Sequence, residues 1–168
     1  MSILAQMLPS VEAVGNPIKT NWDRFHPLPG GKAAFSTLIG MMAPYSGTIG
    51  ARVEELRVGY GRCTLRDRRK VRNHLRCVHA IALVNLAEIT GNLALGYSMP
   101  DDARFIPTGI DIKYLKKARG TITCVAECPI PDTSESTTFA FPVQLLNDAG
   151  ETVAEVTLTT LVGPKRNG

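Results

Sequence analysis

The chain has 168 residues and a mass of 18.2 kDa, about the size of one globular domain. Hydrophobic residues make up 44% of the sequence and charged residues 20%, an ordinary balance that excludes disordered, collagen-like and coiled-coil proteins. The net charge is +4, because 19 basic residues stand against 15 acidic ones.

Residues 1–45 are expected to form an N-terminal helical extension packed on a core domain that comprises residues 46–168. Prolines break this extension into short helices, and Ala33 to Met42 is its most continuous apolar stretch. The first fifteen residues lack a basic region and contain Glu12 and Pro9, so they do not resemble a secretory signal. No uninterrupted apolar run reaches the ~18–20 residues that a membrane helix needs. We therefore expect a cytoplasmic protein with no membrane partner.

Alternating apolar and polar residues after Thr48 predict a β-hairpin, with Gly59 and Gly61 as bend positions. The segment Cys77–Tyr97 is almost entirely apolar and lacks proline, so it predicts one long helix buried nearly all round. Four further strands are expected downstream, at residues 106–114, 121–128, 137–146 and 152–162. This order has no βαβ alternation. The fold class is therefore α+β, with an antiparallel sheet wrapped around the helix.

The four cysteines are expected to be reduced, since a chain of this size does not depend on disulfides. They are Cys63, Cys77, Cys124 and Cys128. They form no Cys-x-x-Cys pair, so we expect no metal site.

Three polar residues interrupt the long apolar helix. Asn85, Glu88 and Asn92 stand at i, i+3 and i+7, which places them on one narrow face. No basic residue lies three or four positions from Glu88, and burial of an unpaired carboxylate raises its pKa. Glu88 is therefore either a structural carboxylate, paired elsewhere or exposed along a groove, or a group tuned for proton transfer.

The start of the same helix is a natural site for an anion or a developing oxyanion, because its first backbone N–H groups have no partner within the helix. His74, His79 and Ala80 lie at this end, and the small side chain of Ala80 allows close approach to its amide. Ala80 and Glu88 are eight residues apart, about 12 Å along a helix. If both act on one substrate, a second copy of the chain must supply one of them, as in a two-fold dimer.

Basic residues form two clusters that could attract phosphates, whether of nucleic acid or of a phosphorylated cofactor, and that could equally be solvated faces. The first runs from Arg57 to Arg76, and the second comprises Lys113, Lys116, Lys117 and Arg119. The first cluster contains a single aromatic residue, Tyr60, whereas stacking platforms for nucleic acid use several. We therefore expect no nucleic-acid partner.

Several of these residues together resemble the hot-dog-fold acyl-CoA thioesterases of the phenylacetate-pathway type. The resemblance rests on Asn73 followed after six residues by Ala80, and then on Leu86-Ala87-Glu88. Three further segments, at residues 43–48, 71–74 and 78–83, are similar to an uncharacterised bacterial subgroup of that superfamily. The resemblance implies a homodimer joined by edge pairing of the strand after the helix, with a tetramer left open, and active sites at the interface.

The resemblance also implies a role for each matching residue. Ala80 takes the place of a glycine whose amide polarises the thioester carbonyl, with His79 beside it. Asn73 matches the asparagine that positions the thioester or the water, and Glu88 of the opposite subunit matches the acidic general base or nucleophile. Arg76 and Ala80 both stand where glycine is common in the family. No metal or redox cofactor is needed.

The implied function is hydrolysis of an acyl-CoA thioester to a free acid and coenzyme A. Substrate-binding residues are expected on and after the interface strand: Thr108, Lys113, Lys116, Lys117 and Arg119. The first alternative is a catalytically silent hot-dog protein that binds acyl-CoA or acts as an interaction module. The second is a nucleic-acid-binding domain.

Overall fold

The computed structural model describes residues 15–165, so the first fourteen residues, on which most of the secretory-signal expectation depends, lie outside the described residues. Three helices come first: α2 (Pro17–Phe25), α3 (Gly31–Met42) and α4 (Pro44–Gly47). The hairpin and the central helix follow: β1 (Arg52–Arg57), β2 (Tyr60–Leu65), the 3₁₀ turn η1 (Arg69–Val71) and α5 (Ala80–Ser98). Four strands complete the chain: β3 (Ala103–Tyr114), β4 (Ile122–Glu127), β5 (Thr137–Leu146) and β6 (Thr152–Pro164).

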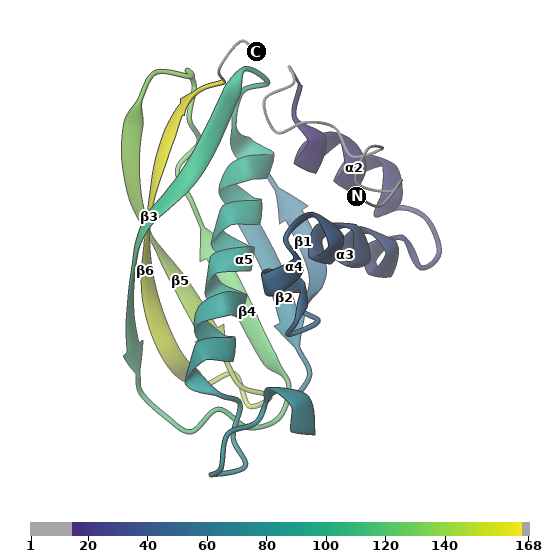
Figure 1. The fold of residues 1–168 in the computed structure, drawn as a ribbon, viewed down its shortest axis with the longest axis vertical. Coiled ribbons are helices and arrows are strands. Elements are labelled where there is room, and N and C mark those ends of the chain that lie inside the picture. The colour runs from purple at the N-terminus through teal and green to yellow at the C-terminus, as the bar shows by residue number, and fades with distance from the viewer. Residues whose placement is uncertain (1–14, 166–168) are drawn as a thin grey trace.

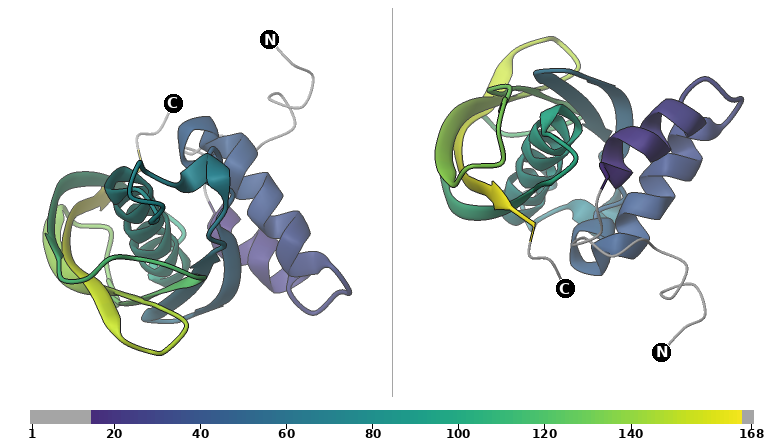
Figure 2. Two further views of the ribbon diagram at one scale, coloured as in Figure 1. Left: turned by 90° about the horizontal axis from the view of Figure 1, so that it is seen from below. Right: turned by 90° about the horizontal axis from the view of Figure 1, so that it is seen from above.

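All six strands form one antiparallel sheet in the order β1-β2-β4-β5-β6-β3. The sheet lies behind α5 in Figure 1, and the end-on views of Figure 2 show it curving around that helix. Helices α2 and α3 lie outside this wrapped sheet, next to β1. The expected α+β class, with a sheet wrapped around one long helix, is confirmed.

Helix α5 is the centre of the core, because its apolar residues face neighbours on almost every side. Fourteen of its nineteen residues are buried. By length and composition α5 could cross a membrane, which corrects the expectation that no segment could, but most of it is buried in this protein. Burial of this kind is typical of a core helix in a globular protein.

Two glycines allow α5 to approach the sheet closely. A Cβ on Gly61 would lie 2.9 Å from the Cβ of Ala94, and one on Gly91 would lie 2.6 Å from Cδ2 of Leu158. Gly61 therefore lies within β2 as a packing position, not at a bend as expected. The turn of the hairpin is made by Gly59, whose φ of 76° is in the left-handed region that favours glycine.

Side chains of α2 and α3 cover the outer edge of β1. The Val53 N–H donates to Ser36 Oγ at 2.9 Å, and Trp22 Nε1 donates to the Leu56 carbonyl at 3.1 Å. Trp22 is itself buried edge-on against Phe35, with ring centroids 5.1 Å apart. These contacts satisfy backbone groups that an edge strand would otherwise expose. A boundary between extension and core at residue 45 stays a prediction.

The opposite edge of the sheet is open. Strand β3 is hydrogen-bonded to β6 and, among residues 15–165, to no other strand. A bulge at Thr108 interrupts its register. Three large apolar side chains on β3 are exposed: Ile106, Ile110 and Tyr114. A long apolar edge of this kind is a template for pairing with another chain.

The cysteines are all free thiols, as expected. Cys63 and Cys124 face one another across β2 and β4, fully buried. Burial raises the pKa of the Cys63 thiol to about 12 and also raises the pKa of Cys124. Both groups therefore stay protonated at neutral pH and act as small apolar side chains of the core.

Candidate active site

The first turn of α5 presents backbone N–H groups that have no partner in the described part of the chain. His79 is the N-cap, and its Nδ1 accepts a hydrogen bond from the Ile81 N–H at 3.1 Å. This acceptor role assigns the ring proton of the neutral imidazole to Nε2. The amides of Ala80 and Ala82 donate to no group in residues 15–165. The turn can therefore bind an oxyanion between two amides at the positive end of the helix dipole.

The loop before α5 is shaped by Asn73. Its Oδ1 accepts hydrogen bonds from the N–H groups of Leu75 at 2.9 Å and Cys77 at 3.2 Å. Arg76 within this loop has a φ of 56°, the only positive value among non-glycine residues in the described chain. The Asn73 oxygen is thus engaged in loop structure, and the amide nitrogen is the part of this side chain left to contact a substrate.

The expected polar face of α5 is present and lacks partners. Glu88 is half-buried and forms no hydrogen bond or ion pair with any group in residues 15–165, and its burial raises the pKa of its carboxyl group. The Oδ1 atoms of Asn85 and Asn92 are buried and likewise have no hydrogen-bond partner in the described part of the chain. Because buried polar atoms in folded proteins are nearly always hydrogen-bonded, this face fits a polar ligand or another chain.

A cavity of about 400 Å³ opens beside the start of α5. From α5 it is lined by Ile81, Ala82 and Asn85, and His79, the N-cap of that helix, lines it as well. Two cations of the first basic cluster, Lys70 and Arg72, also line it. Its remaining walls are Tyr45, Thr48, Ile49 and Val71. The cavity therefore combines an anion-binding helix end with positive charge.

Parts of both basic clusters flank the same end of α5. The Val78 N–H donates to the Ala118 carbonyl at 2.8 Å, which places Lys116, Lys117 and Arg119 of the second cluster near His79. Lys116 Nζ forms an exposed ion pair with Glu151 at 2.6 Å, while Lys117 and Arg119 are exposed. Sequence reasoning favoured the second cluster and gave less weight to Lys70 and Arg72, because only the fold shows that those two line the cavity.

Lys113 and Thr108 lie elsewhere on β3. Lys113 lines a shallow cavity with Asp111 and Glu155 on the outer face of the sheet, away from α5. Thr108 is exposed at the bulge, and its hydroxyl donates to the Thr159 carbonyl at 3.3 Å.

Tyr114 contacts the candidate site, and sequence reasoning did not identify it. Its hydroxyl donates to the Ala80 carbonyl at 3.3 Å, so the end of the open strand β3 contacts the first turn of α5. The signal in the sequence was the position of Tyr114 at the end of the apolar alternation of that strand. The contact brings the open edge of the sheet next to the helix end.

Ala80 and Glu88 do not meet within one chain, since eight residues of helix separate them by about 12 Å. Residues 15–165 contain no group of His, Cys, Asp and Glu side chains that could hold a metal ion.

The sequence matches over residues 31–162 a family described as a domain of unknown function, DUF4442. No curated protein matches it. Among solved structures, the structural-genomics protein APC5556 is 32% identical, with a TM-score of 0.75 over 88% of this chain and 98% of its own.

Two more distant structures share the fold. The Pseudomonas aeruginosa protein PA5026, of unknown function and termed a probable thioesterase, is 22% identical with a TM-score of 0.70, over 82% of this chain and 97% of its own. The Staphylococcus aureus thioesterase SAV0944 is 16% identical with a TM-score of 0.64, over 72% and 99%.

Proposed function

The chain belongs to the DUF4442 family and has the hot-dog fold of thioesterases, and from this premise we propose that it hydrolyses acyl-CoA thioesters to a free acid and coenzyme A. The observation that carries the proposal is the half-buried Glu88 on the polar face of α5, which has no hydrogen-bond or ion-pair partner within residues 15–165, together with the Ala80 and Ala82 amides, which donate to no group there either. Thioester hydrolysis requires these two elements, a base for water and donors for the oxyanion.

The donors are the backbone amides at the start of α5. A thioester carbonyl oxygen placed there accepts from Ala80, and the helix dipole stabilises the negative charge that develops as water attacks. The side chain of Ala80 is one methyl group, so it leaves the amide accessible. His79 adds a second polar group at this position, since Nε2 carries a proton when Nδ1 accepts from Ile81.

The base is Glu88 of the second subunit. Burial raises the pKa of this carboxyl group toward neutrality, which improves its ability to take a proton from water. Water then attacks the carbonyl carbon as Glu88 takes its proton, and the tetrahedral oxyanion forms at the amides. When this intermediate collapses, the C–S bond breaks and the sulfur takes the proton from Glu88, which releases coenzyme A as its thiol. A carboxylate attacking directly as a nucleophile is the other route open to the same residue.

The second subunit pairs through β3. Two copies of this edge in antiparallel register extend the sheet across a two-fold axis and cover the exposed Ile106 and Ile110. Because Tyr114 contacts the start of α5, such pairing brings the partner close to the oxyanion donors. We propose the homodimer as the active unit. A tetramer built from two such dimers is compatible with it.

Cations at the start of α5 support binding of the coenzyme A phosphates. We propose Lys116, Lys117 and Arg119 as their ligands, with Lys70 and Arg72 as the competing set. The four free thiols fit a reducing compartment, so we propose the cytosol as the place of action.

A second candidate function is binding of acyl-CoA without hydrolysis. Arg76 favours this candidate. It has a positive φ, and it stands where the phenylacetate-pathway-type thioesterases that the sequence resembles usually have glycine.

The test is hydrolysis of a panel of acyl-CoAs, followed with a thiol-trapping dye. We expect the wild type to release thiol and Glu88→Gln to lose activity by a factor on the order of 10² to 10⁴, the usual range for a general base. Mixing inactive Glu88→Gln chains with inactive Asn73→Ala chains should restore one working site in each heterodimer. Binding of acyl-CoA with no thiol release from any substrate would select the second candidate function instead.

A further inference from the structure

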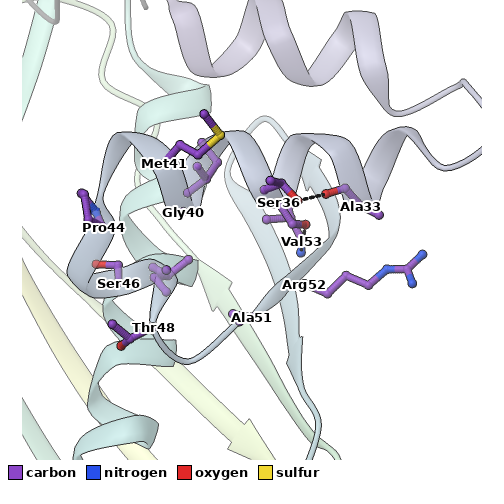
Figure 3. A pocket seen from close by; sticks show the side chains of 15 residues that line it. Ala33, Ser36, Gly40, Met41, Pro44, Ser46, Thr48, Ala51, Arg52 and Val53 are labelled. Atoms are coloured by element: carbon purple, nitrogen blue, oxygen red, sulfur yellow. Dashed lines mark hydrogen bonds between the residues drawn. The ribbon is translucent and has the colours of Figure 1, made fainter. Parts of the chain in front are cut away.

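A second cavity, of about 570 Å³, lies between α3, α4 and the segment that enters β1 (Figure 3). From α3 it is lined by Ala33, Ser36, Thr37, Ile39, Gly40 and Met41. Its other walls are Pro44, Ser46, Gly47, Thr48, Gly50, Ala51, Arg52, Val53 and Ile89. Its size falls within the ~300–1,000 Å³ of typical ligand pockets.

The walls of this cavity are small and mostly apolar. Arg52 is the one charged residue among them, and its Nε forms an ion pair with Glu54 at 3.2 Å. No aromatic side chain lines the cavity. It therefore offers no cluster of cations for phosphates and no flat ring for stacking, but it does offer a mostly aliphatic surface.

This cavity lies next to the one at the start of α5. Thr48 lines both of them. Along α5 the first cavity reaches Asn85 and the second includes Ile89, which is about one helical turn further on. The two cavities are therefore neighbours along one side of the helix.

We propose that this second cavity binds the acyl part of the substrate and that it selects flexible aliphatic chains over aromatic acids. This inference rests on the proposed function, since the acyl carbonyl must sit at the start of α5 for its chain to enter the cavity. The helices α3 and α4 thereby set substrate specificity, because they form most of the cavity wall.

A series of straight-chain acyl-CoAs of increasing length tests the chain preference. Each methylene buried in the cavity contributes about 0.8 kcal/mol, so kcat/KM should rise about fourfold per methylene until the cavity is full. Phenylacetyl-CoA and benzoyl-CoA should be poorer substrates than aliphatic chains of equal carbon number. Aromatic substrates as good as the best aliphatic one would overturn the proposal.

A matched pair of variants tests the location. Ala33 and Ala34 are exposed neighbours on α3, but only Ala33 lines the cavity. Ala33→Phe should lower kcat/KM for the longest good substrate by about tenfold or more and spare the shortest, since it fills the end of the pocket. Ala34→Phe should leave the chain-length profile unchanged. Identical profiles in the two variants, in an enzyme that hydrolyses acyl-CoAs, would overturn the cavity assignment and leave the proposed function standing.

Binding of a non-hydrolysable S-dodecyl-CoA thioether, measured by calorimetry, separates the two proposals further. If no acyl-CoA is hydrolysed but the thioether binds and Ala33→Phe weakens it at least tenfold relative to Ala34→Phe, the proposed function fails and the chain-binding role of the cavity holds. If the wild type and both variants bind S-dodecyl-CoA no better than coenzyme A itself, the cavity does not bind alkyl chains.

Discussion

Glu88 carries a cost in stability that should be visible in the pH dependence of unfolding. Because folding raises its pKa, the native state holds this proton more tightly than the unfolded chain. The stability tied to the proton is therefore present below the ordinary pKa of the group and is lost as pH rises through the folded pKa. Glu88→Gln should melt at a higher temperature than the wild type near about pH 7.5, and the difference should vanish near about pH 4.

The matched control for this prediction is Glu135→Gln, which removes the same charge from an exposed position. Thermal melts of the three proteins at several pH values decide the matter. A gain at neutral pH that is equal in both variants would show a general charge effect and not the burial of Glu88.

Arg76 should limit stability for a local reason. Its φ of 56° places a side chain in the left-handed region, which costs about 1–2 kcal/mol for a residue with a Cβ. Arg76→Gly removes this strain but adds freedom to the unfolded chain, so we expect a net gain of about 0.5–1 kcal/mol. Urea unfolding should show a higher midpoint at constant slope. Arg76→Ala removes the charge and keeps the Cβ, so an equal gain there would disprove the strain.

Among the elements, α3 should stabilise β1 through one hydroxyl group. Ser36 Oγ accepts from the Val53 N–H and donates to the Lys32 carbonyl at 2.7 Å. Ser36→Ala leaves a partly buried amide without its acceptor, at a cost of about 1–3 kcal/mol. Thr37→Ala is the control, since that hydroxyl bonds only the exposed Ala33 carbonyl. Equal destabilisation of both variants in urea would contradict a specific role for Ser36.

Sequence reasoning predicted best the elements whose type and bounds follow from the order of apolar and polar residues within their own segment. The expected helix at Cys77–Tyr97 is found at Ala80–Ser98, because its apolar residues suit a core helix in any arrangement. Strand β5 has the expected bounds of 137–146. Strand β3 begins at Ala103, three residues before the expected start at residue 106. Pairing with the end of β6 extends the strand beyond the segment in which apolar and polar residues alternate.

The site was predictable only where one element contains it. The polar face with Glu88 follows from helical spacing, and so does its separation from Ala80. The contact of Tyr114 with Ala80, the cavity under α3 and the cavity beside the start of α5 all join segments far apart in the chain, so they depend on the packing of the whole molecule. The loop role of Asn73 depends on local hydrogen bonds that its position relative to the helix does not reveal.

At the scale of the whole molecule, the open edge at β3 predicts the state of association. Sedimentation at micromolar concentration should give about twice the chain mass of 18.2 kDa. Ile110→Glu puts a charge on this edge and should yield folded monomers with little thiol release, since edge charges oppose strand pairing. Val58→Glu, at an exposed apolar position of the hairpin turn, should remain dimeric and active. An active monomer would refute the shared site.

The contacts of Ser36 and Trp22 with β1 limit the number of sheet edges at which another copy of the chain can pair. A strand edge can add a new strand only while its backbone groups are available. Within residues 15–165 the Val53 N–H and the Leu56 carbonyl of β1 already have side-chain partners, whereas the open edge of β3 pairs with no strand. The chain therefore has one edge through which it can extend its sheet, like a monofunctional monomer in polymer chemistry. Pairing of two β3 strands uses the open edge of both copies, so sheet extension ends at two copies and gives a closed complex rather than a fibre.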